Sequence, residues 1–355
     1  MKALILCGGR GTRLLPLTRT TPKHLLPVAN KPILFYQLEQ VTEAGIGDIG
    51  IVVSPETGGR IKEAVGDGSR WGVSINYIDQ PQPLGLAHAV MTARGFLGDD
   101  CFLVLLGDNL IGCDFAELLE RFGAEKADAL ITLKEVADPR RFGVAEVDDK
   151  GKVVCLTEKP REPKSRLAIA GGYVFTPEIH RAIAGISPSS RGELEITDAI
   201  QKLVVAGKKI TSHALQGWWF DIGTRDGLLE ANSTILDNCL KADIKGNIDT
   251  ESKVTGRVSI RQGTEVVNST VRGPASIGED CRIEGSLIGP FVSIGDRAVI
   301  EGSAIERSII LEGCRIYKTK PICNSVIGRN TEVTTKGETS AKVELFIGDD
   351  GRLEL

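Results

Sequence analysis

The sequence predicts a Rossmann-like α/β domain with a parallel or mixed sheet, followed by a left-handed parallel β-helix. Two observations support this fold class. The first two thirds of the 355 residues alternate short apolar runs with segments of helical spacing, and the last third carries a short-period aliphatic repeat. A chain of this length favours two domains over one compact core. We place them at residues 1–238 and 239–355.

Short apolar runs in the first domain are expected to form buried strands, because each is rich in Val, Ile and Leu. The expected strands are residues 2–7, 48–54, 75–79, 101–108 and 129–135. Between them, residues 32–45, 86–97 and 114–124 have apolar residues at helical spacing. Alternating strands and helices predict a sheet that binds ligands beyond the carboxyl ends of its strands.

A six-residue repeat predicts the second domain. Val254, Ile260 and Val266 lie six residues apart, and the first member recurs 17 residues later at Val271 and again at Ile288. A hexad with an aliphatic residue at each turn is typical of a left-handed parallel β-helix, in which three short strands form each coil. We expect the tail, residues 337–355, to form a hairpin that caps the last coil.

Composition excludes several classes of function. The net charge of −4 provides no basic field for nucleic acid or for an anionic membrane. The apolar run at residues 3–7 is too short for a signal sequence or a membrane span, so we expect a cytoplasmic protein. The eight cysteines form no C-x-x-C pair, which predicts buried free thiols and no zinc site.

A glycine-rich segment follows the first predicted strand. Three glycines in the four residues 8–11 let backbone N–H groups approach a ligand closely. Arg10, Arg13 and Lys23 add positive charge, which suits a triphosphate. Neither G-x-G-x-x-G nor G-x-x-x-x-G-K-[ST] occurs here, so the segment is neither a dinucleotide fingerprint nor a Walker loop. Taken alone, it could also be a glycine-rich turn with solvated arginines.

Residues 8–32 resemble the signature of sugar nucleotidyltransferases, G-G-x-G-T-R-L-x-P-x-T-x-x-x-x-K-x-L-L-P-V followed by K-P. The matching residues are Gly8, Gly9, Gly11, Thr12, Arg13, Leu14, Pro16, Thr18, Lys23, Leu25, Leu26, Pro27, Lys31 and Pro32. The resemblance implies that this loop wraps a nucleoside triphosphate, with Leu6 beside it. It also implies that Arg13 and Lys23 are catalytic and neutralise the leaving pyrophosphate.

Two aspartates are candidate metal ligands. Asp108 ends the predicted strand 101–108, where it would face the ligand crevice. Mg²⁺ prefers one or two carboxylates together with phosphate oxygens and water. The resemblance supplies the second carboxylate, Asp221 in W-W-F-D-I-G-T, where the family has W-x-D-x-G-T. We therefore expect both residues to bind Mg²⁺ and Asp108 to be catalytic. The alternatives are that Asp108 is a turn residue and that Asp221 is a helix cap.

A sugar-binding segment is expected between the two aspartates. Phe142-Gly143 and Glu158-Lys159-Pro160 match the family pattern (Y/F)-G-V followed by E-K-P. The resemblance implies that Gly143 and Glu158 contact sugar hydroxyls and that Lys159 holds the sugar phosphate. A carboxylate can accept two hydroxyl protons, and a lysine is a compact positive charge for a phosphate. A surface ion pair is the alternative for Glu158 and Lys159.

Two later segments complete the resemblance, which covers residues 1 to about 230. Gly172 and Tyr173 are implied to orient the sugar. Arg191 opens the run R-G-E-L-E-I-T-D, which is close to the thymidylyl-transferring branch of the family, and is implied to approach the phosphates. The long form with a β-helical tail resembles members from deoxysugar and antibiotic-sugar pathways and from archaea.

Base recognition is expected at residues 80–89, where Gln80 and Gly85 match the family. A glutamine amide offers a donor and an acceptor, which suits thymine or uracil. Gly85 followed by Leu86 favours thymidylyl transfer, whereas Leu84 and His88 depart from that pattern. One thymine methyl group contributes only ~1–3 kcal/mol to discrimination. Use of UTP, alone or beside dTTP, is therefore the alternative.

The resemblance thus implies Mg²⁺-dependent transfer of a thymidylyl group from dTTP to α-D-glucose 1-phosphate, giving dTDP-glucose and pyrophosphate. We expect small-molecule substrates, no nucleic-acid or membrane partner, and a homo-oligomer built through the β-helix. A second activity as an acyltransferase is disfavoured, because all four histidines lie upstream of the repeat. A non-catalytic scaffold is also disfavoured, because Arg13, Lys23 and both aspartates are present.

Overall fold

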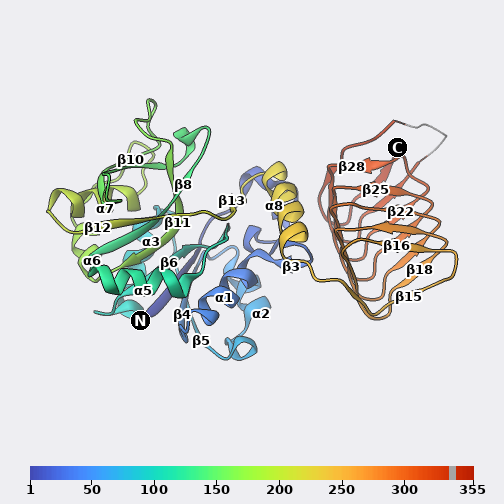
Figure 1. The fold of residues 1–355 in the computed structure, drawn as a ribbon, viewed down its shortest axis with the longest axis horizontal. Coiled ribbons are helices and arrows are strands. Elements are labelled where there is room, and N and C mark those ends of the chain that lie inside the picture. The colour runs from blue at the N-terminus through green and yellow to red at the C-terminus, as the bar shows by residue number, and fades with distance from the viewer. Residues whose placement is uncertain (336–340) are drawn as a thin grey trace. The chain divides into compact units, whose positions relative to one another are not determined.

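The structure is a computed structural model that describes residues 1–335 and 341–355, and it divides into two compact units. Unit 1 consists of Met1–Arg10 and Ile33–Asp221, and unit 2 consists of Gly11–Pro32 and Ile222–Leu355 (Figure 1). The chain therefore passes between the units three times. This division does not coincide with the single boundary expected at residue 238.

Unit 1 is built on a mixed sheet of nine strands. Its parallel part has the order β6-β1-β4-β5, and the strands are β1 (Lys2–Cys7), β4 (Asp48–Val53), β5 (Ser74–Asp79) and β6 (Phe102–Leu106). Beyond β6 the neighbours are mainly antiparallel and comprise β8 (Ala129–Glu135), β9 (Gly143–Val147), β10 (Val153–Glu158), β11 (Leu167–Phe175) and β12 (Ile210–Ala214). The predicted α/β class is confirmed. The fourth expected strand ends earlier, which leaves Gly107 and Asp108 in a turn.

The helices of unit 1 follow the apolar spacing of the sequence. They are α1 (Ile33–Glu43), α2 (Gly58–Val65), α3 (Leu86–Thr92), α4 (Arg94–Leu97), α5 (Phe115–Glu125), α6 (Glu178–Ile183) and α7 (Ile196–Val205). The start of α5 is set by Asp114, whose side chain accepts from the N–H groups of Ala116 and Glu117. A short ladder, β7 (Asn109–Ile111) with β13 (Trp219–Asp221), lies outside the main sheet.

Unit 2 contains the predicted left-handed parallel β-helix, whose coils stack along the chain (Figure 1). The first sheet comprises β14 (Asp243–Ile244), β17 (Val258–Ile260), β20 (Ala275–Ile277), β23 (Val292–Ile294), β26 (Ile309–Ile310), β29 (Val326–Ile327) and β31 (Phe346–Ile347). The second comprises β15 (Asn247–Ile248), β18 (Glu265–Val267), β21 (Arg282–Glu284), β24 (Val299–Glu301), β27 (Arg315–Tyr317), β30 (Glu332–Thr334) and β32 (Arg352–Glu354). The third comprises β16 (Lys253–Thr255), β19 (Thr270–Arg272), β22 (Leu287–Ile288), β25 (Ala304–Glu306) and β28 (Ile322–Cys323).

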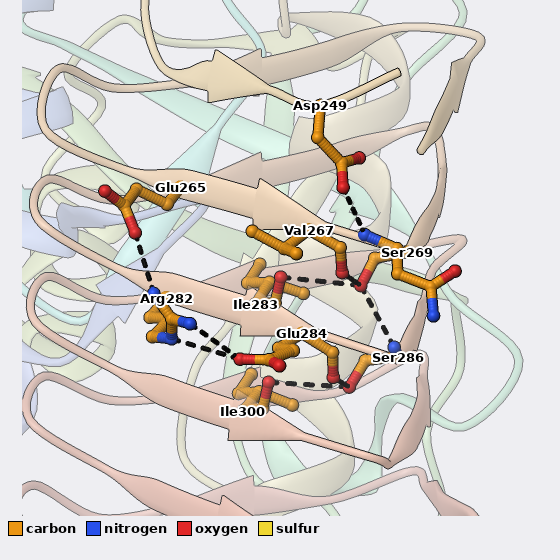
Figure 2. Close-up of polar contacts among 10 residues, drawn as sticks. Asp249, Glu265, Val267, Ser269, Arg282, Ile283, Glu284, Ser286 and Ile300 are labelled. Carbon is orange, nitrogen blue, oxygen red and sulfur yellow. Dashed lines mark hydrogen bonds and ion pairs between the residues drawn. The ribbon is translucent and has the colours of Figure 1, made fainter. Parts of the chain in front are cut away.

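The same contacts recur from coil to coil, as Figure 2 shows. Ser269 Oγ donates to Val267 O at 2.7 Å and accepts from Ser286 N at 3.0 Å. One coil later, Ser286 Oγ donates to Glu284 O at 2.7 Å in the same way. Inside, aliphatic residues such as Ile283 are fully buried. Each coil therefore buries an apolar stack and satisfies its corner with a hydroxyl group.

The predicted terminal hairpin is wrong within residues 341–355. β31 pairs in parallel with β29, and β32 pairs in parallel with β30, so both strands continue the coils. Ile347 and Leu353 pack against the buried aliphatic cluster of the β-helix. Adding to this stack buries apolar surface that an isolated hairpin would leave in water. Residues 337–340 of the expected hairpin lie outside the described residues.

Unit 2 also includes the segment Gly11–Pro32, which we call the loop segment, and helix α8 (Arg225–Asn238). The loop segment has three 3₁₀ turns and a hairpin, namely η1 (Thr12–Leu14), η2 (Leu17–Arg19), η3 (Lys23–Leu25), β2 (Pro27–Val28) and β3 (Lys31–Pro32). Ala29 and Asn30 form the two-residue turn with φ values of 48° and 63°. Two positive φ angles are typical of a type I′ turn.

The sequence predicted buried free thiols and no membrane-spanning segment. All eight cysteines are free, but only Cys7, Cys281 and Cys314 are buried, so the expectation of buried thiols holds for three of them. Burial raises the pKa of Cys281 to about 11 and that of Cys314 to about 12, so these thiols are protonated and unreactive near neutral pH. Within residues 1–335 and 341–355, no helix has both the length and the apolar character needed to cross a membrane.

Candidate active site

The glycine-rich segment begins where β1 ends. Leu6 is buried in β1, and Gly8 follows the strand by one residue. A Cβ atom on Gly8 would lie 2.6 Å from Gln80 Oε1, so the glycine allows the Gln80 amide to lie directly against this backbone. Arg10 Nη2 forms an exposed ion pair with Glu56 Oε1 at 2.6 Å.

Gln80 and Gly85 are brought together, as expected for a base-binding site. Gln80 is buried, and its Nε2 lies 3.4 Å from Gly85 O and 2.9 Å from His88 Nδ1. Gly85 has a φ of +101°, and a Cβ atom there would lie 2.5 Å from Leu194 O. Only glycine suits this position. His88, which departs from the family pattern, thus helps to orient the Gln80 amide.

Asp108 lies in a turn that is braced from helix α1. The buried Gln37 Nε2 donates to Leu106 O and to Asn109 O, both at 2.6 Å, which fixes the two ends of the turn. Asn109 Nδ2 donates to Ala170 O at 3.1 Å and ties the turn to β11. The backbone that carries Asp108 is therefore held from two directions.

Asp221 lies in the two-stranded ladder that β7 forms with β13. It ends β13, which runs antiparallel to β7 and places Asp221 opposite Asn109. Opposite residues of an antiparallel pair have Cα atoms about 4.5–5.5 Å apart. Asp221 therefore lies opposite the residue that follows Asp108. The structure brings the two predicted metal ligands to one end of one ladder.

The chemistry of these two aspartates suits a divalent metal ion. Two carboxylates are what Mg²⁺ takes when phosphate oxygens and water complete its shell. Across the residues that the structure describes, no group of three or more His, Cys, Asp or Glu side chains could hold a metal. The donor set of Asp108 and Asp221 therefore suits a cation that arrives with a phosphate ligand, rather than a closed structural metal site.

Glu158 is the centre of the predicted sugar site. The register of β10 and β9 places it opposite Gly143. Thr197 Oγ1 donates to Glu158 Oε2 at 2.7 Å, and a Cβ atom on Gly143 would lie 2.7 Å from that hydroxyl oxygen. Glu158 Oε1 lies 3.1 Å from Arg191 Nη2 and 3.5 Å from Lys159 Nζ. The structure thus brings four predicted residues together and adds Thr197.

Arg191 is surrounded by carboxylates. Its Nη2 lies 2.7 Å from Glu195 Oε1 and 3.5 Å from Glu193 Oε2, in addition to Glu158. Glu195 is buried and is also held by Ser189 Oγ at 2.7 Å. Sequence reasoning assigned Arg191 to phosphate alone and did not foresee these three acidic neighbours.

Gly172 and Tyr173 lie at an irregularity of β11. The pairing of β11 with β8 changes register between Ile169 and Tyr173. Gly172 N donates to Thr132 Oγ1 at 3.1 Å, and that hydroxyl group donates to Gly172 O at 3.0 Å. The Tyr173 ring is buried and stacks on Phe175. Burial, with a contribution from the charge of Glu158, raises the pKa of Tyr173, so its hydroxyl stays protonated.

The remaining predicted residues belong to the loop segment in unit 2. Gly11 has a φ of +67°, and a Cβ atom there would lie 3.1 Å from Lys23 Cβ. Thr18 Oγ1 donates to Gly11 O at 2.9 Å, which closes the turn around Thr12. The Arg13 guanidinium lies 2.5 Å from where a Cβ atom on Gly223 would be. Arg13 therefore rests against the glycine of the I-G-T run.

Comparison with known proteins places this architecture. A family model described as nucleotidyl transferase matches residues 2–238. The chain belongs to the nucleotidyl transferase family. Members of this family generally use a divalent metal.

Three similar proteins extend this result for the nucleotidyl transferase. A glucose-1-phosphate thymidylyltransferase of Streptomyces griseus is 47% identical over 355 residues, which covers 100% of this chain and 99% of that protein. One of Streptomyces antibioticus is 48% identical over 100% of this chain and 99% of its own length. A crystal structure of a putative glucose-1-phosphate thymidylyltransferase from Bacillus anthracis, in complex with sucrose, is 38% identical with a TM-score of 0.62. It covers 66% of this chain and 94% of its own.

Sequence reasoning missed several residues that support the site of this nucleotidyl transferase. Gln37 braces the Asp108 turn, Asn109 ties it to β11, and Thr197 and Glu195 hold Glu158 and Arg191. Gln37 carried a usable signal, because it is a polar residue among apolar ones at buried positions of a helix. Thr197 and Glu195 lie in R-G-E-L-E-I-T-D, but nothing in that run shows which strand they face.

Proposed function

We propose that this nucleotidyl transferase transfers a thymidylyl group from dTTP to α-D-glucose 1-phosphate and releases pyrophosphate, with Mg²⁺ as its metal. The observation that carries the proposal is the identity of 47% and 48% over the whole chain to two proteins named glucose-1-phosphate thymidylyltransferase. The clusters around Asp108, Gln80 and Glu158 support it, because they would supply a metal site, a base site and a sugar site.

In the proposed reaction, a phosphate oxygen of glucose 1-phosphate attacks the α-phosphorus of dTTP in line. The new P–O bond forms as the bond to pyrophosphate breaks. A phosphate monoester is largely ionised at neutral pH, so the attack needs no protein base. Catalysis then consists of positioning and of stabilising the developing charge. Asp108 and Asp221 would hold Mg²⁺, which supplies positive charge at the phosphates when bound.

The loop residues are proposed to bind the triphosphate and its leaving group. Gly8, Gly9 and Gly11, with Leu6 and Thr12, would present backbone and small side chains to the phosphates. Arg13 and Lys23 would offset the charge that builds on pyrophosphate. A lysine and an arginine suit this role because both remain cationic at neutral pH.

In the proposed sugar site, the cations that pair with Glu158 would pair with the sugar phosphate instead. Lys159 and Arg191 both lie within 3.5 Å of Glu158 Oε1. A sugar phosphate arriving there would draw the two cations to its own oxygens and release Glu158 to accept hydroxyl protons. Gly143, Gly172 and Tyr173 would border the sugar ring.

The Gln80 amide supports a base that carries an N3–H group. Its Nε2 is already engaged by Gly85 O and His88 Nδ1, which leaves Oε1 as an acceptor. Thymine and uracil donate from N3, whereas cytosine accepts there. The amide therefore favours dTTP or UTP over CTP.

We further propose that residues 1–238 act as the catalytic domain and that residues 239–355 form the β-helical domain. The same proposal includes cytoplasmic location, homo-oligomer formation, and no nucleic-acid or membrane partner. The net charge of −4 supports the last point, because it provides no general attraction to polyanions.

A substrate grid tests the proposed function. Pyrophosphate release would be measured for dTTP, UTP, CTP, ATP and GTP, each with glucose, galactose and N-acetylglucosamine 1-phosphates, with Mg²⁺ or with EDTA. We expect the highest kcat/KM with dTTP and glucose 1-phosphate, with UTP lower by about 10- to 200-fold, and no release in EDTA. Preference for UTP would select the uridylyltransferase alternative. Preference for a purine nucleotide, or no release with any pair, would contradict both.

A further inference from the structure

The loop segment is attached to the β-helix at two places within unit 2. The first is its hairpin tip. Asn30 Nδ2 lies 2.8 Å from Ile294 O and 3.1 Å from both Ser276 O and Ser276 Oγ. Ser276 lies in β20 and Ile294 in β23, which are neighbouring strands of one sheet. The amide group of the turn thus bonds to two successive coils.

Asn232 of helix α8 strengthens this first attachment. It is 1% exposed, and its Oδ1 accepts from Ala29 N at 2.8 Å and from Ser293 Oγ at 2.7 Å. One buried oxygen therefore joins the loop segment to the β-helix. Removing it would leave a backbone N–H group and a hydroxyl group without an acceptor, which is costly where water is excluded.

The second attachment lies at the last coils. Thr20 Oγ1 donates to Asp349 Oδ2 at 2.6 Å, and Arg329 Nη1 donates to Thr21 Oγ1 at 2.6 Å. Arg329 and Asp349 also brace each other, because Asp349 Oδ1 accepts from Arg329 N at 2.7 Å. Pro16 packs against Gly348, where an added Cβ atom would lie 3.1 Å from the proline ring.

The two attachments flank Lys23 in the chain. Thr20 and Thr21 precede it, and Ala29 and Asn30 follow it. On the β-helix, β23 and β31 are separated by β26 and β29, which corresponds to about 14 Å at about 4.8 Å per strand. A single rigid stack of coils therefore holds both ends of the stretch that carries Lys23.

We propose that the β-helix is a positioning element for catalysis, in which Asn232, Arg329 and Asp349 hold the loop segment so that Lys23 and Arg13 are correctly placed. This inference rests on the proposed function, which assigns those two cations to the leaving pyrophosphate. It gives the second domain a role beyond assembly. The three residues act through the loop segment and are positioning residues.

The expected signature is a change in rate that exceeds the change in stability. Misplacing a catalytic group by about 1 Å can lower a rate about 10²-fold. The Thr20–Asp349 hydrogen bond is exposed, so its loss should hardly change the unfolding midpoint, whereas loss of the Asp349 acceptor for Arg329 N should lower the midpoint slightly. Loss of positioning would lower kcat while leaving the KM for glucose 1-phosphate nearly constant, because the sugar site lies on other elements.

A matched pair of variants tests the proposal in the full chain. Asp296 follows Ile-Gly in I-G-D-R as Asp349 does in I-G-D-D, and its Oδ1 accepts from Glu279 N at 2.8 Å. This hydrogen bond joins two residues of the β-helix and does not involve the loop segment. We expect Asp349→Ala to lower kcat about 10-fold, and Asp296→Ala to stay within about 2-fold. Asp349→Asn should restore most of the rate, because an amide can bond to both Arg329 N and Thr20 Oγ1.

A second readout does not depend on activity. Hydrogen–deuterium exchange of residues 12–26 should be faster in Asp349→Ala and in Asn232→Ala than in the unmodified protein, and unchanged in Asp296→Ala. The proposal is overturned if kcat and exchange in Asp349→Ala match the unmodified protein, or if Asp296→Ala shows the same changes. If the unmodified protein transfers no nucleotide, the proposed function fails, and the exchange experiment still decides whether the β-helix holds the loop segment.

Discussion

The sheet of unit 1 and the β-helix of unit 2 both rely on parallel strand pairs, but they assemble them differently. In unit 1, β1 pairs with β4 and with β6, whose residues are far from it in the chain. In the β-helix, β17 pairs with β20, and Val258 lies opposite Ala275, 17 residues later. Each contact of the sheet therefore occurs once, whereas each contact of the β-helix has copies in neighbouring coils.

This difference shows where chemistry can be built. The candidate site of unit 1 uses irregular features, namely the turn at Gly107–Asp108, the register shift in β11 and the positive φ angle of Gly85. None of these has a duplicate. In the coils, the same serine hydrogen bonds recur at equivalent corner positions, so the loss of one of them leaves the equivalent bonds of the other coils in place. Changes in unit 1 should therefore act on function, whereas changes in the coils should act mainly on stability, except at the residues that bond to the loop segment.

The largest effect should come from Asp108→Asn. The variant removes one of two carboxylates proposed to hold the metal, and loss of a single group that stabilises transition-state charge lowers kcat by about 10²- to 10³-fold. The measurement is kcat as a function of Mg²⁺ concentration. Asp100→Asn is the control, because Asp100 flanks the other end of β6, is exposed, and forms an ion pair of 3.8 Å with Lys2. Equal activities of the two variants would remove Asp108 from the metal site.

A smaller effect is expected from Gly171→Ala. Gly171 has a φ of +81°, and an added Cβ atom would collide with Asn109 Nδ2. We expect a loss of about 2–4 kcal/mol in the free energy of unfolding, from backbone strain together with the collision. Activity should also fall, because Asn109 follows Asp108. Urea unfolding and kcat measure the two effects.

Gly207→Ala is the matched control for that variant. Gly207 has a φ of +74°, but nothing lies within 4 Å of an added Cβ atom. It should therefore lose only about 1–2 kcal/mol from backbone strain and keep its activity. If the free energy of unfolding falls equally in both variants, the close approach of Gly171 to Asn109 does not contribute to stability.

The smallest effect should come from Ser286→Ala in the β-helix. It removes one hydroxyl group of the serine series, which should lower the free energy of unfolding by about 0.5–1.5 kcal/mol and leave kcat unchanged. Ser269→Ala, one coil away, should behave alike, because both residues make the same contacts (Figure 2). Thermal or urea unfolding of the two variants is the measurement. A large difference between them would contradict the redundancy of the coils.

The sequence predicted the β-helix well because its partners are near in the chain. Ile260 and Ile277 pair across 17 residues, so the hexad spacing carries the pairing directly. The sequence did not predict the final coil, because the segment before Ile347 interrupts the six-residue spacing of the aliphatic residues. In unit 1 the apolar runs predicted β1, β4 and β5, but no local pattern showed that β9, β10 and β11 pair antiparallel, since this depends on contacts between distant segments.

The candidate site shows the same division. The glycine-rich turn and Asp108 after a strand were identifiable from residue types and spacing, whereas the Glu158-Lys159 pair was identified through the family resemblance. The sequence could not show that Gln37 holds the Asp108 turn, that three carboxylates surround Arg191, or that Thr197 lies against Gly143. Gln37 and Asn109, Glu158 and Arg191, and Gly143 and Thr197 are each more than 30 positions apart in the chain, so only chain packing brings the members of each pair together.

By itself, the sequence determined the fold class, the repeat and the chemical character of each motif, because local spacing and residue type carry that information. Only the tertiary structure decided that Asp221 lies opposite Asn109, and that the segment with Arg13 and Lys23 is bonded to the β-helix through Asn232, Arg329 and Asp349. The physical reason is that a hydrogen bond depends on distance and direction, and for distant residues these are set by the packing of the whole unit.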